Sequence, residues 1–128
     1  MIYGVGIDMV EIARIEAGLV RFGRRFAERI LSSSEFREYE RAPRPAEFLA
    51  RRFAAKEALV KAAGTGFRDG LFLREISVSH DALGKPSLEF SEQASRTLER
   101  LGVGRTHLSI SDEREYALAY VLLEQKFC

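Results

Sequence analysis

The sequence contains very little cysteine and histidine. Among its 128 residues, Cys128 is the only cysteine, and His80 and His107 are the only histidines. One cysteine excludes a disulfide framework or a cysteine-zinc site within a single chain. Two histidines disfavour a metal site built from several imidazoles.

The chain also lacks a large net charge and long apolar segments. Its formal net charge is +1, so we expect no nucleic-acid partner, and charged partners must contact local patches. No apolar run approaches the roughly 18 residues that span a membrane. The N-terminus does not have the basic start and apolar run of a signal peptide. We therefore expect a cytoplasmic protein with no membrane partner.

The length and composition are typical of a globular protein. Hydrophobic residues make up 46% of the 128 residues and charged residues 30%, which is enough for one domain with a core. Pro43 and Pro45 lie in a segment too short to link two domains. The sequence predicts a single domain spanning residues 1–128.

The segment from Arg51 to Gly66 has the pattern of a helix that ends in a glycine-rich turn. Good helix formers occupy nearly every position. Pro45 suits a first helical turn, and Gly64 stands where a C-terminal cap is expected. We predict a helix from about Pro45 to Ala63. Its helical wheel carries an apolar stripe of Leu49, Phe53 and Val60, and beside it a second stripe of Ala50, Ala54, Glu57 and Lys61.

Glu57 and Lys61 allow two interpretations. Such an i, i+4 pair is common on solvent-exposed helix faces, where it adds only about 0.2–0.5 kcal/mol. The alternative is a phosphate site, because Arg52 and Lys56 add positive charge on the other side of the apolar stripe. The turn over residues 64–66 can also present backbone N–H groups and a threonine hydroxyl to an anion.

Residues Met1 to Val10 are expected to form a strand. Gly4 and Gly6 would let another segment approach the backbone closely. Asp8 interrupts the apolar pattern and again has two interpretations. It could end the strand and cap the next turn, or it could place a carboxylate at a strand end beside a cleft.

Residues 14–41 have a helical pattern interrupted by glycines. Ser32 and Glu35 fit a capping box for a short helix through about Glu40. Over residues 14–29, five arginines against two glutamates give a local balance of +3. These arginines are Arg14, Arg21, Arg24, Arg25 and Arg29. The run is either a solvated face or a docking surface for an acidic partner, for which we select Arg14, Arg21, Arg24 and Arg25.

The rest of the chain predicts strands and one further helix. The expected elements are a strand over 72–79, a turn over 81–86, a strand through about 90, a helix from the cap Ser91 to about 101, and strands over 106–111 and 115–123. The last two strands should pair as a hairpin. This order predicts an α+β fold with a largely antiparallel sheet packed on a long central helix. The GxGxxG and P-loop motifs are absent.

Two isolated acids, Asp8 and Glu57, and the basic residues of the long helix suggest a chemistry. Two carboxylates without histidine suit Mg²⁺, which keeps several waters and takes its other ligands from phosphate oxygens. The basic groups Arg52, Lys56 and Lys61 would neutralise those phosphates. The residue types therefore favour phosphoryl-type transfer on a nucleotide-like substrate, where positioning and electrostatics dominate catalysis.

Four segments together resemble a known family. They are GVGIDMVEIARI over 4–15, RFAAKEALVKAAGTG over 52–66, GKP over 84–86 and SISDEREYA over 109–117. This combination closely resembles holo-acyl-carrier-protein synthase, the small single-domain type of 4′-phosphopantetheinyl transferase. The resemblance covers nearly the full length of the chain.

The resemblance implies an enzyme that moves the 4′-phosphopantetheine arm of coenzyme A to a serine of apo acyl carrier protein. The resemblance further implies that adenosine 3′,5′-bisphosphate is released and that the modified carrier protein serves fatty acid biosynthesis. The family is typically homotrimeric, with active sites between subunits. The carrier protein, coenzyme A and further copies of the chain are the implied partners.

The resemblance also implies roles for individual residues. Asp8 and Glu57 match the acids that hold Mg²⁺, Glu57 and Lys61 are the catalytic candidates, and Lys61 and Arg52 match basic residues around the coenzyme phosphates. The segments lining the coenzyme site match Gly64, Thr65, Gly66, Gly84, Lys85 and Pro86.

Two points stay open on the sequence. Many relatives have histidine at the position of Asp112, and we leave this acid out of the site because a carboxylate cannot be a direct phosphate ligand. The group that deprotonates the serine could be Glu57, a metal-bound water, or a carboxylate acting through water.

Two other functions compete with transfer. A non-catalytic binding module for acidic helical proteins would use the arginine face alone and would have no need for paired acids beside a glycine turn. A Mg²⁺-dependent nucleotide pyrophosphatase would transfer the phosphoryl group to water rather than to a protein.

Overall fold

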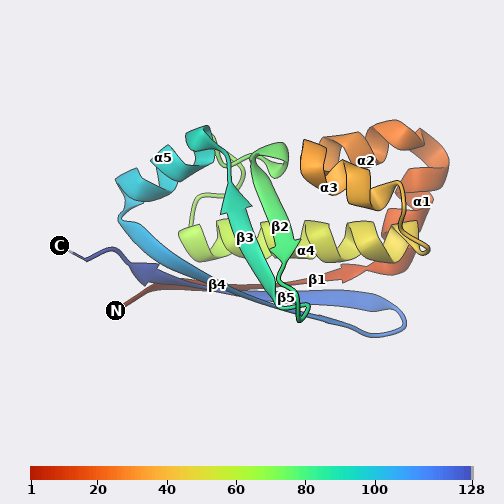
Figure 1. The fold of residues 1–128 in the computed structure, drawn as a ribbon. Helices are drawn as coiled ribbons and strands as arrows, with labels where there is room; N and C mark the ends of the chain where they lie inside the picture. Colours follow the sequence, from red (N-terminus) through yellow and green to blue (C-terminus); the bar gives the residue numbers. More distant parts are fainter. Residues whose placement is uncertain (128) are drawn as a thin grey trace.

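The computed structural model describes residues 1–127 and has an α+β fold, as predicted (Figure 1). Its elements in chain order are β1 (Ile2–Glu11), α1 (Ile12–Phe22), α2 (Arg24–Ile30), α3 (Ser33–Tyr39), α4 (Pro45–Ala63), the 3₁₀ turn η1 (Leu73–Glu75), β2 (Ile76–His80), β3 (Pro86–Phe90), α5 (Glu92–Leu101), β4 (Val103–Asp112) and β5 (Tyr116–Gln125). No helix within residues 1–127 is long and apolar enough to cross a membrane.

The long helix α4 has the predicted bounds. It starts with Pro45 at the first position and ends at Gly64, which adopts the left-handed conformation with φ 78°. Its surroundings differ from the prediction, because burial extends far beyond one apolar stripe. Arg52 and Lys56 are 3% and 0% exposed, so of the three basic residues expected on this helix only Lys61 reaches the surface. The helical wheel missed this because it cannot show how many sides of a helix are covered.

The main sheet is antiparallel, with strand order β1-β5-β4, and α4 covers one of its faces (Figure 1). The predicted hairpin of β4 and β5 is confirmed, with both strands longer than expected. A second sheet consists of β2 and β3 alone. The expected strand over 72–79 is wrong in its first part, because residues 73–75 form a 3₁₀ turn whose Leu73 carbonyl accepts a hydrogen bond from Lys56.

Two glycines bring β1 against α4. A Cβ atom at Gly4 would overlap the backbone carbonyl of Ala62, and one at Gly6 would overlap that of Ala58. The close approach expected at these glycines is therefore present, and the segment that approaches is the long helix. Because alternate residues of a strand share a face, Asp8 points to the same side of β1 as Gly4 and Gly6.

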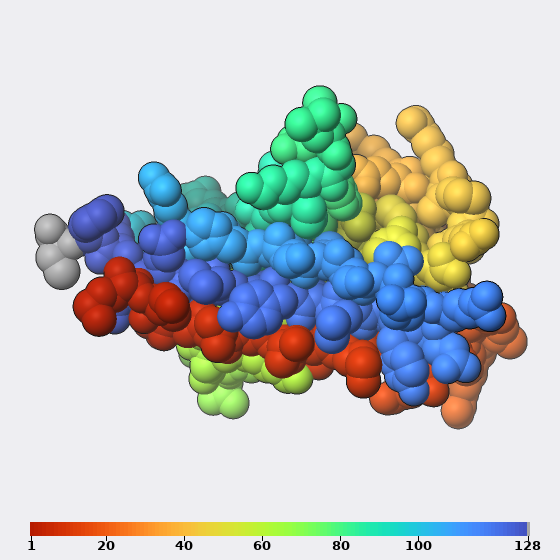
Figure 2. All heavy atoms as spheres, turned by 90° about the horizontal axis from the view of Figure 1, so that it is seen from below, coloured from red at the N-terminus to blue at the C-terminus, as the bar shows by residue number. Residues whose placement is uncertain are grey.

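The other face of the main sheet is the one seen in Figure 2, and it carries exposed apolar side chains. They are Val5, Ile7 and Met9 of β1 and Tyr116 and Tyr120 of β5. The opposite face of β5 buries small and branched residues under α4, including Ala119 and Val121 at 0% exposure. This central strand is thus apolar on both faces, as its sequence indicates.

The arginine-rich part of the chain forms α1 and α2, with Gly23 between them at φ 63°. The short helix α3 has the predicted capping box, in which Ser32 accepts from Glu35 N and Glu35 accepts from Ser32 N. Ser91 and Gly102 cap α5 as expected. The helices α1, α2 and α3 stand beside the N-terminal half of α4 (Figure 1), and α1 and α2 form a wall next to the part of β1 that contains Asp8.

Candidate active site

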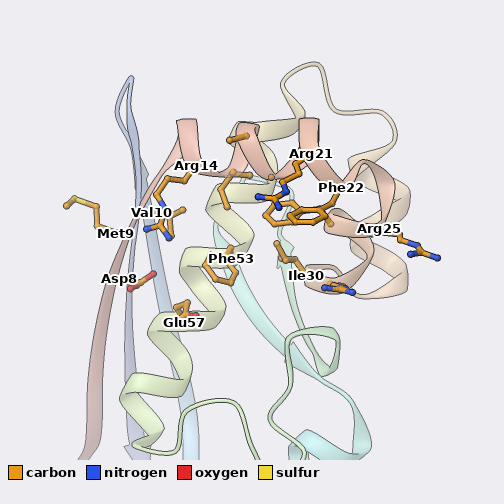
Figure 3. A pocket seen from close by; sticks show the side chains of 15 residues that line it. Asp8, Met9, Val10, Arg14, Arg21, Phe22, Arg25, Ile30, Phe53 and Glu57 are labelled. Carbon is orange, nitrogen blue, oxygen red and sulfur yellow. The ribbon is translucent and has the colours of Figure 1, made fainter.

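A groove of about 1040 Å³ lies between β1, α4 and the pair α1–α2 (Figure 3). Asp8 of β1 and Glu57 of α4 lie side by side at one end of it (Figure 3). The far wall is formed by arginine and apolar side chains of α1 and α2. Two acids that are 49 positions apart in the sequence are thus brought to one place, and arginines of α1 and α2 line the same groove.

Asp8 lies inside β1, which continues to Glu11. The expectation that Asp8 stands at a strand end is therefore wrong. Its side chain is 16% exposed and points toward α4 because it shares a face with Gly6, whose missing side chain lets β1 contact Ala58. The cause of this placement is backbone packing between the strand and the helix.

Lys61 pairs with Asp8 rather than with Glu57. Its Nζ donates to Asp8 Oδ1 at 2.8 Å and to the carbonyl of Ile7 at 3.1 Å. The hydrogen bond to Asp8 raises the pKa of Lys61 above its ordinary value. The side chain is 52% exposed, so the ammonium can exchange this partner for another anion at small cost.

Glu57 carries unfavourable negative charge. Burial raises the pKa of Glu57, the Asp8 charge raises it further, and Lys61 opposes both effects. Two neighbouring carboxylates that repel one another form a place where a cation is favourable. Within residues 1–127 no group of three or more histidine, cysteine or acidic side chains could hold a metal ion. Asp8 and Glu57 fit an ion such as Mg²⁺, which needs only one or two protein carboxylates.

Three of the four arginines selected from the sequence line the groove, namely Arg14, Arg21 and Arg25. Arg24 does not line it. Its guanidinium contacts Glu28 at 3.4 Å and Glu40 at 3.3 Å and lies over the ring of Phe36. Arg24 and Arg25 are adjacent on a short helix, so their side chains point in different directions.

Sequence reasoning left out several groove residues. Arg29 lines the groove one turn after Arg25, and Phe22, Phe26 and Phe53 supply apolar surface. Arg29 was noted within the arginine run, and its i+4 spacing from Arg25 is the signal that could have selected it. The aromatic residues look like ordinary core anchors in the sequence, and only the fold turns them toward the groove.

Arg52 is buried away from the groove. Its guanidinium donates to Glu38 Oε2 at 2.9 Å, lies 3.5 Å from Glu35 and stacks over Phe48. Burial lowers the pKa of Arg52, and Glu35 opposes this effect most strongly. A role for Arg52 at the coenzyme phosphates therefore stays a prediction. In this structure its guanidinium is buried and contacts the carboxylates of Glu35 and Glu38.

The two glycine segments lie apart from one another. The chain after α4, with Gly64 and Gly66 at positive φ, emerges on one long side of the sheet, and the β2–β3 hairpin with Gly84 at its turn projects on the other (Figure 2). Thr65 Oγ1 donates to the Gly66 carbonyl. One chain does not bring its two predicted coenzyme segments together.

Comparisons with known proteins agree with this architecture. A model of the 4′-phosphopantetheinyl transferase superfamily matches residues 4–121. A holo-(acyl-carrier-protein) synthase of Hamiltonella defensa is 54% identical over 123 residues, which cover 96% of this chain and 98% of that protein. The crystal structure of such a synthase from Neisseria meningitidis has a TM-score of 0.95 at 46% identity, covering 98% of this chain and 100% of that one.

A further solved structure shows a bound ligand. A holo-(acyl-carrier-protein) synthase from Helicobacter pylori in complex with coenzyme A has a TM-score of 0.82 at 32% identity, covering 94% of this chain and 99% of that one. Family match, sequence identity and fold thus agree over nearly the whole length. The chain belongs to the 4′-phosphopantetheinyl transferase superfamily, within its group of holo-(acyl-carrier-protein) synthases.

Proposed function

We propose that this chain transfers the 4′-phosphopantetheine arm of coenzyme A to a serine of an apo acyl carrier protein. The serine oxygen forms a bond to the phosphorus that carries pantetheine, and the bond from that phosphorus to the bridging oxygen breaks. Adenosine 3′,5′-bisphosphate leaves, and the serine proton is released. The observation that carries the proposal is the placement of Asp8, Glu57 and Lys61 beside an arginine-lined groove.

Asp8 and Glu57 would hold Mg²⁺. The repulsion between the two carboxylates supports this assignment, because it is relieved by a bound cation. When bound, the ion supplies positive charge to the oxygens of the pyrophosphate. Two protein ligands leave several of its positions to substrate and water.

Lys61 would stabilise the charge that develops on the pyrophosphate during transfer. Its ammonium is already held at the metal-binding acid by the 2.8 Å bond to Asp8. Because half of its side chain is exposed, Lys61 can turn to a phosphate oxygen without leaving a buried charge unpaired.

The arginine wall would bind the carrier protein. Arg14, Arg21 and Arg25 are exposed and line the same groove as the two acids. An acidic helix docked against them would deliver its serine toward Asp8 and Glu57. The planar guanidinium suits this contact because it pairs with carboxylates through two parallel hydrogen bonds. The product would serve fatty acid biosynthesis.

We further propose that the chain assembles into a homotrimer with active sites between subunits. Two observations support this: the exposed apolar face around Tyr120, and the placement of the two coenzyme segments on opposite sides of the chain (Figure 2). Tyr120 lies in the central strand between Ile7 and Ser109. Light scattering of Tyr120→Glu should therefore report monomer, whereas the parent protein should be trimeric. A parent monomer of 14.5 kDa contradicts the assembly.

Mass spectrometry of apo acyl carrier protein tests the proposed function. Incubation with coenzyme A, Mg²⁺ and this protein should add the phosphopantetheine group to the carrier and release adenosine 3′,5′-bisphosphate. Omission of Mg²⁺, or a carrier whose serine is changed to alanine, should leave the mass unchanged. Cleavage of coenzyme A without carrier modification would favour a pyrophosphatase, and carrier binding with neither reaction would favour a binding module.

A further inference from the structure

Lys56 is the largest fully buried side chain within residues 1–127, and the proposed chemistry does not use it. It is 0% exposed, and its Nζ donates to the carbonyls of Ile30 at 2.7 Å and Leu73 at 2.9 Å and to Glu35 Oε1 at 2.5 Å. Burial lowers the pKa of Lys56, and the Glu35 charge opposes this effect. All three donor positions of the ammonium are thus occupied by groups from other elements.

Glu35 extends this contact to two more elements. Its Oε1 also accepts from Ser32 N at 3.0 Å, and its Oε2 accepts from Val78 N of β2 at 2.9 Å. Lys56 and Glu35 together therefore join α4 to the end of α2, the start of α3, η1 and β2. Arg52 lies 3.5 Å from the same carboxylate.

The contact with Ile30 connects this network to the groove. Ile30 is the last residue of α2 and lines the groove, and its carbonyl is one of the helix-terminal carbonyls that α2 itself cannot satisfy. Ala27 and Ile30 are the buried residues of this short helix, and the hydrogen bond from Lys56 fixes the terminal carbonyl in addition to their apolar contacts. Lys56 directly precedes Glu57 in α4. Glu57 lines the end of the groove that holds the two acids, and Lys56 contacts the α2 wall through Ile30.

Stability alone does not account for a buried lysine and glutamate. Replacing a buried ion pair by apolar residues is often neutral or stabilising, because removing two charges from water is costly. What the ion pair provides is direction, since each hydrogen bond fixes where a partner carbonyl or amide must lie. An apolar side chain at residue 56 would fill the volume without holding Ile30 in place.

We propose that Lys56 and Glu35 are positioning residues that hold the α2 wall, with Arg25 and Arg29, at a fixed place relative to Glu57. They set the docking of the acidic partner rather than the binding of coenzyme A. The effect on docking of the acidic partner rests on the proposed function. The effect on the position of α2 rests only on the contacts of Lys56.

Two variants test the inference. Lys56→Met removes the ammonium and leaves Glu35 buried without its main partner, so it should lower both stability and partner binding. The double variant Lys56→Met with Glu35→Gln removes both charges and should recover the stability. In both variants the KM for carrier protein should rise on the order of 10-fold, as expected for a misplaced binding group. The KM for coenzyme A should stay within about twofold.

Hydrogen exchange supplies a readout that needs no activity. In both variants the amides at the end of α2, residues 27–30, should exchange on the order of 10-fold faster, while those of β5 keep their rate in the stabilised double variant. Leu98→Ala, a core change in α5, is the matched control for lost stability. In this control the α2 amides should exchange no faster than those of the other elements. Both KM values should equal those of the parent protein.

Three results would overturn the inference. Unchanged α2 exchange in the double variant would mean that Lys56 does not hold this helix. Recovery of the carrier KM together with stability would make the network structural only. An equal rise of both KM values would place the effect on the whole site. Absence of transfer by the parent protein would instead refute the proposed function, and hydrogen exchange would still decide the placement of α2.

Discussion

Lys61 donates a 2.8 Å hydrogen bond to the carboxylate of Asp8, a residue 53 positions earlier in the chain. The same ammonium donates to the carbonyl of Ile7, so it bridges the backbone and the side chain of β1. The bond places a mobile positive charge at the acid that we propose as a metal ligand. Within residues 1–127, Glu57 forms no ion pair, and the Lys61 charge acts on it only from a distance.

Loss of the Lys61 ammonium should slow transfer. Lys61→Ala should lower kcat on the order of 10²-fold, the scale seen when one stabilising donor is removed. Lys61→Arg should recover only part of the rate, because the guanidinium spreads and displaces the charge. Steady-state kinetics measures both. Lys126→Ala, which removes an exposed lysine paired with Glu99, is the control and should keep the parent rate; an unaffected Lys61→Ala would reduce Lys61 to a surface partner of Asp8.

Both acids should be needed for metal binding. Asp8→Ala and Glu57→Ala should each abolish Mg²⁺-dependent transfer, and titration calorimetry should show weaker Mg²⁺ binding, because each variant removes one of two carboxylate ligands. Circular dichroism should show an intact fold in both, since neither acid is in the core. Full Mg²⁺ binding by either variant would remove that residue from the metal site.

The raised pKa of Glu57 predicts a pH-dependent stability effect in metal-free buffer. A raised pKa means that the folded protein binds the proton more tightly than the unfolded chain does. The associated stability is present below the unfolded pKa of about 4.3 and is lost as pH rises through the folded pKa. Glu57→Gln should therefore be more stable than the parent at pH 7, and urea unfolding should show this advantage shrinking as pH falls toward 4. A difference that is constant with pH would contradict the shift.

The arginine wall should act on the carrier protein alone. Reversal of Arg14, Arg21 and Arg25 to glutamate should strongly raise the KM for carrier protein and barely change that for coenzyme A. The effect should weaken in high salt, where the Debye length falls to about 3 Å at 1 M. Arg24→Glu is the matched control for Arg25→Glu, because Arg24 contacts Glu28 and Glu40 outside the groove. Equal effects of these two single variants would place the docking face elsewhere.

The contact between β1 and α4 should not tolerate a side chain. Gly6→Ala should lower the free energy of unfolding by about 1–3 kcal/mol, the usual cost of overpacking, because its Cβ would meet the Ala58 carbonyl. It should also lower transfer activity by moving Asp8 away from Glu57. Gly104→Ala in β4, where the nearest atom is 3.1 Å from the new Cβ, should lose less stability. Urea unfolding at one pH compares the two variants.

The sequence by itself determined the local elements of this protein. The bounds of α4, the capping box of Ser32 and Glu35 and the caps Ser91 and Gly102 all follow from residues within a few positions of one another. The β4–β5 hairpin follows from two neighbouring apolar segments around a turn. The motifs of the chain also indicated the family correctly, because they contain the predicted site residues in a characteristic order and spacing.

Only the tertiary structure decided which charged side chains meet. A helical wheel cannot distinguish Lys61, which reaches Asp8 at the surface, from Lys56, which is enclosed by Glu35 and two carbonyls. Nor can an arginine run show that Arg25 lines the groove while Arg24 pairs with Glu28 and Glu40. The physical reason is the same in each case: the direction and partner of a long charged side chain depend on elements that are distant in the sequence and reach it only when the chain folds.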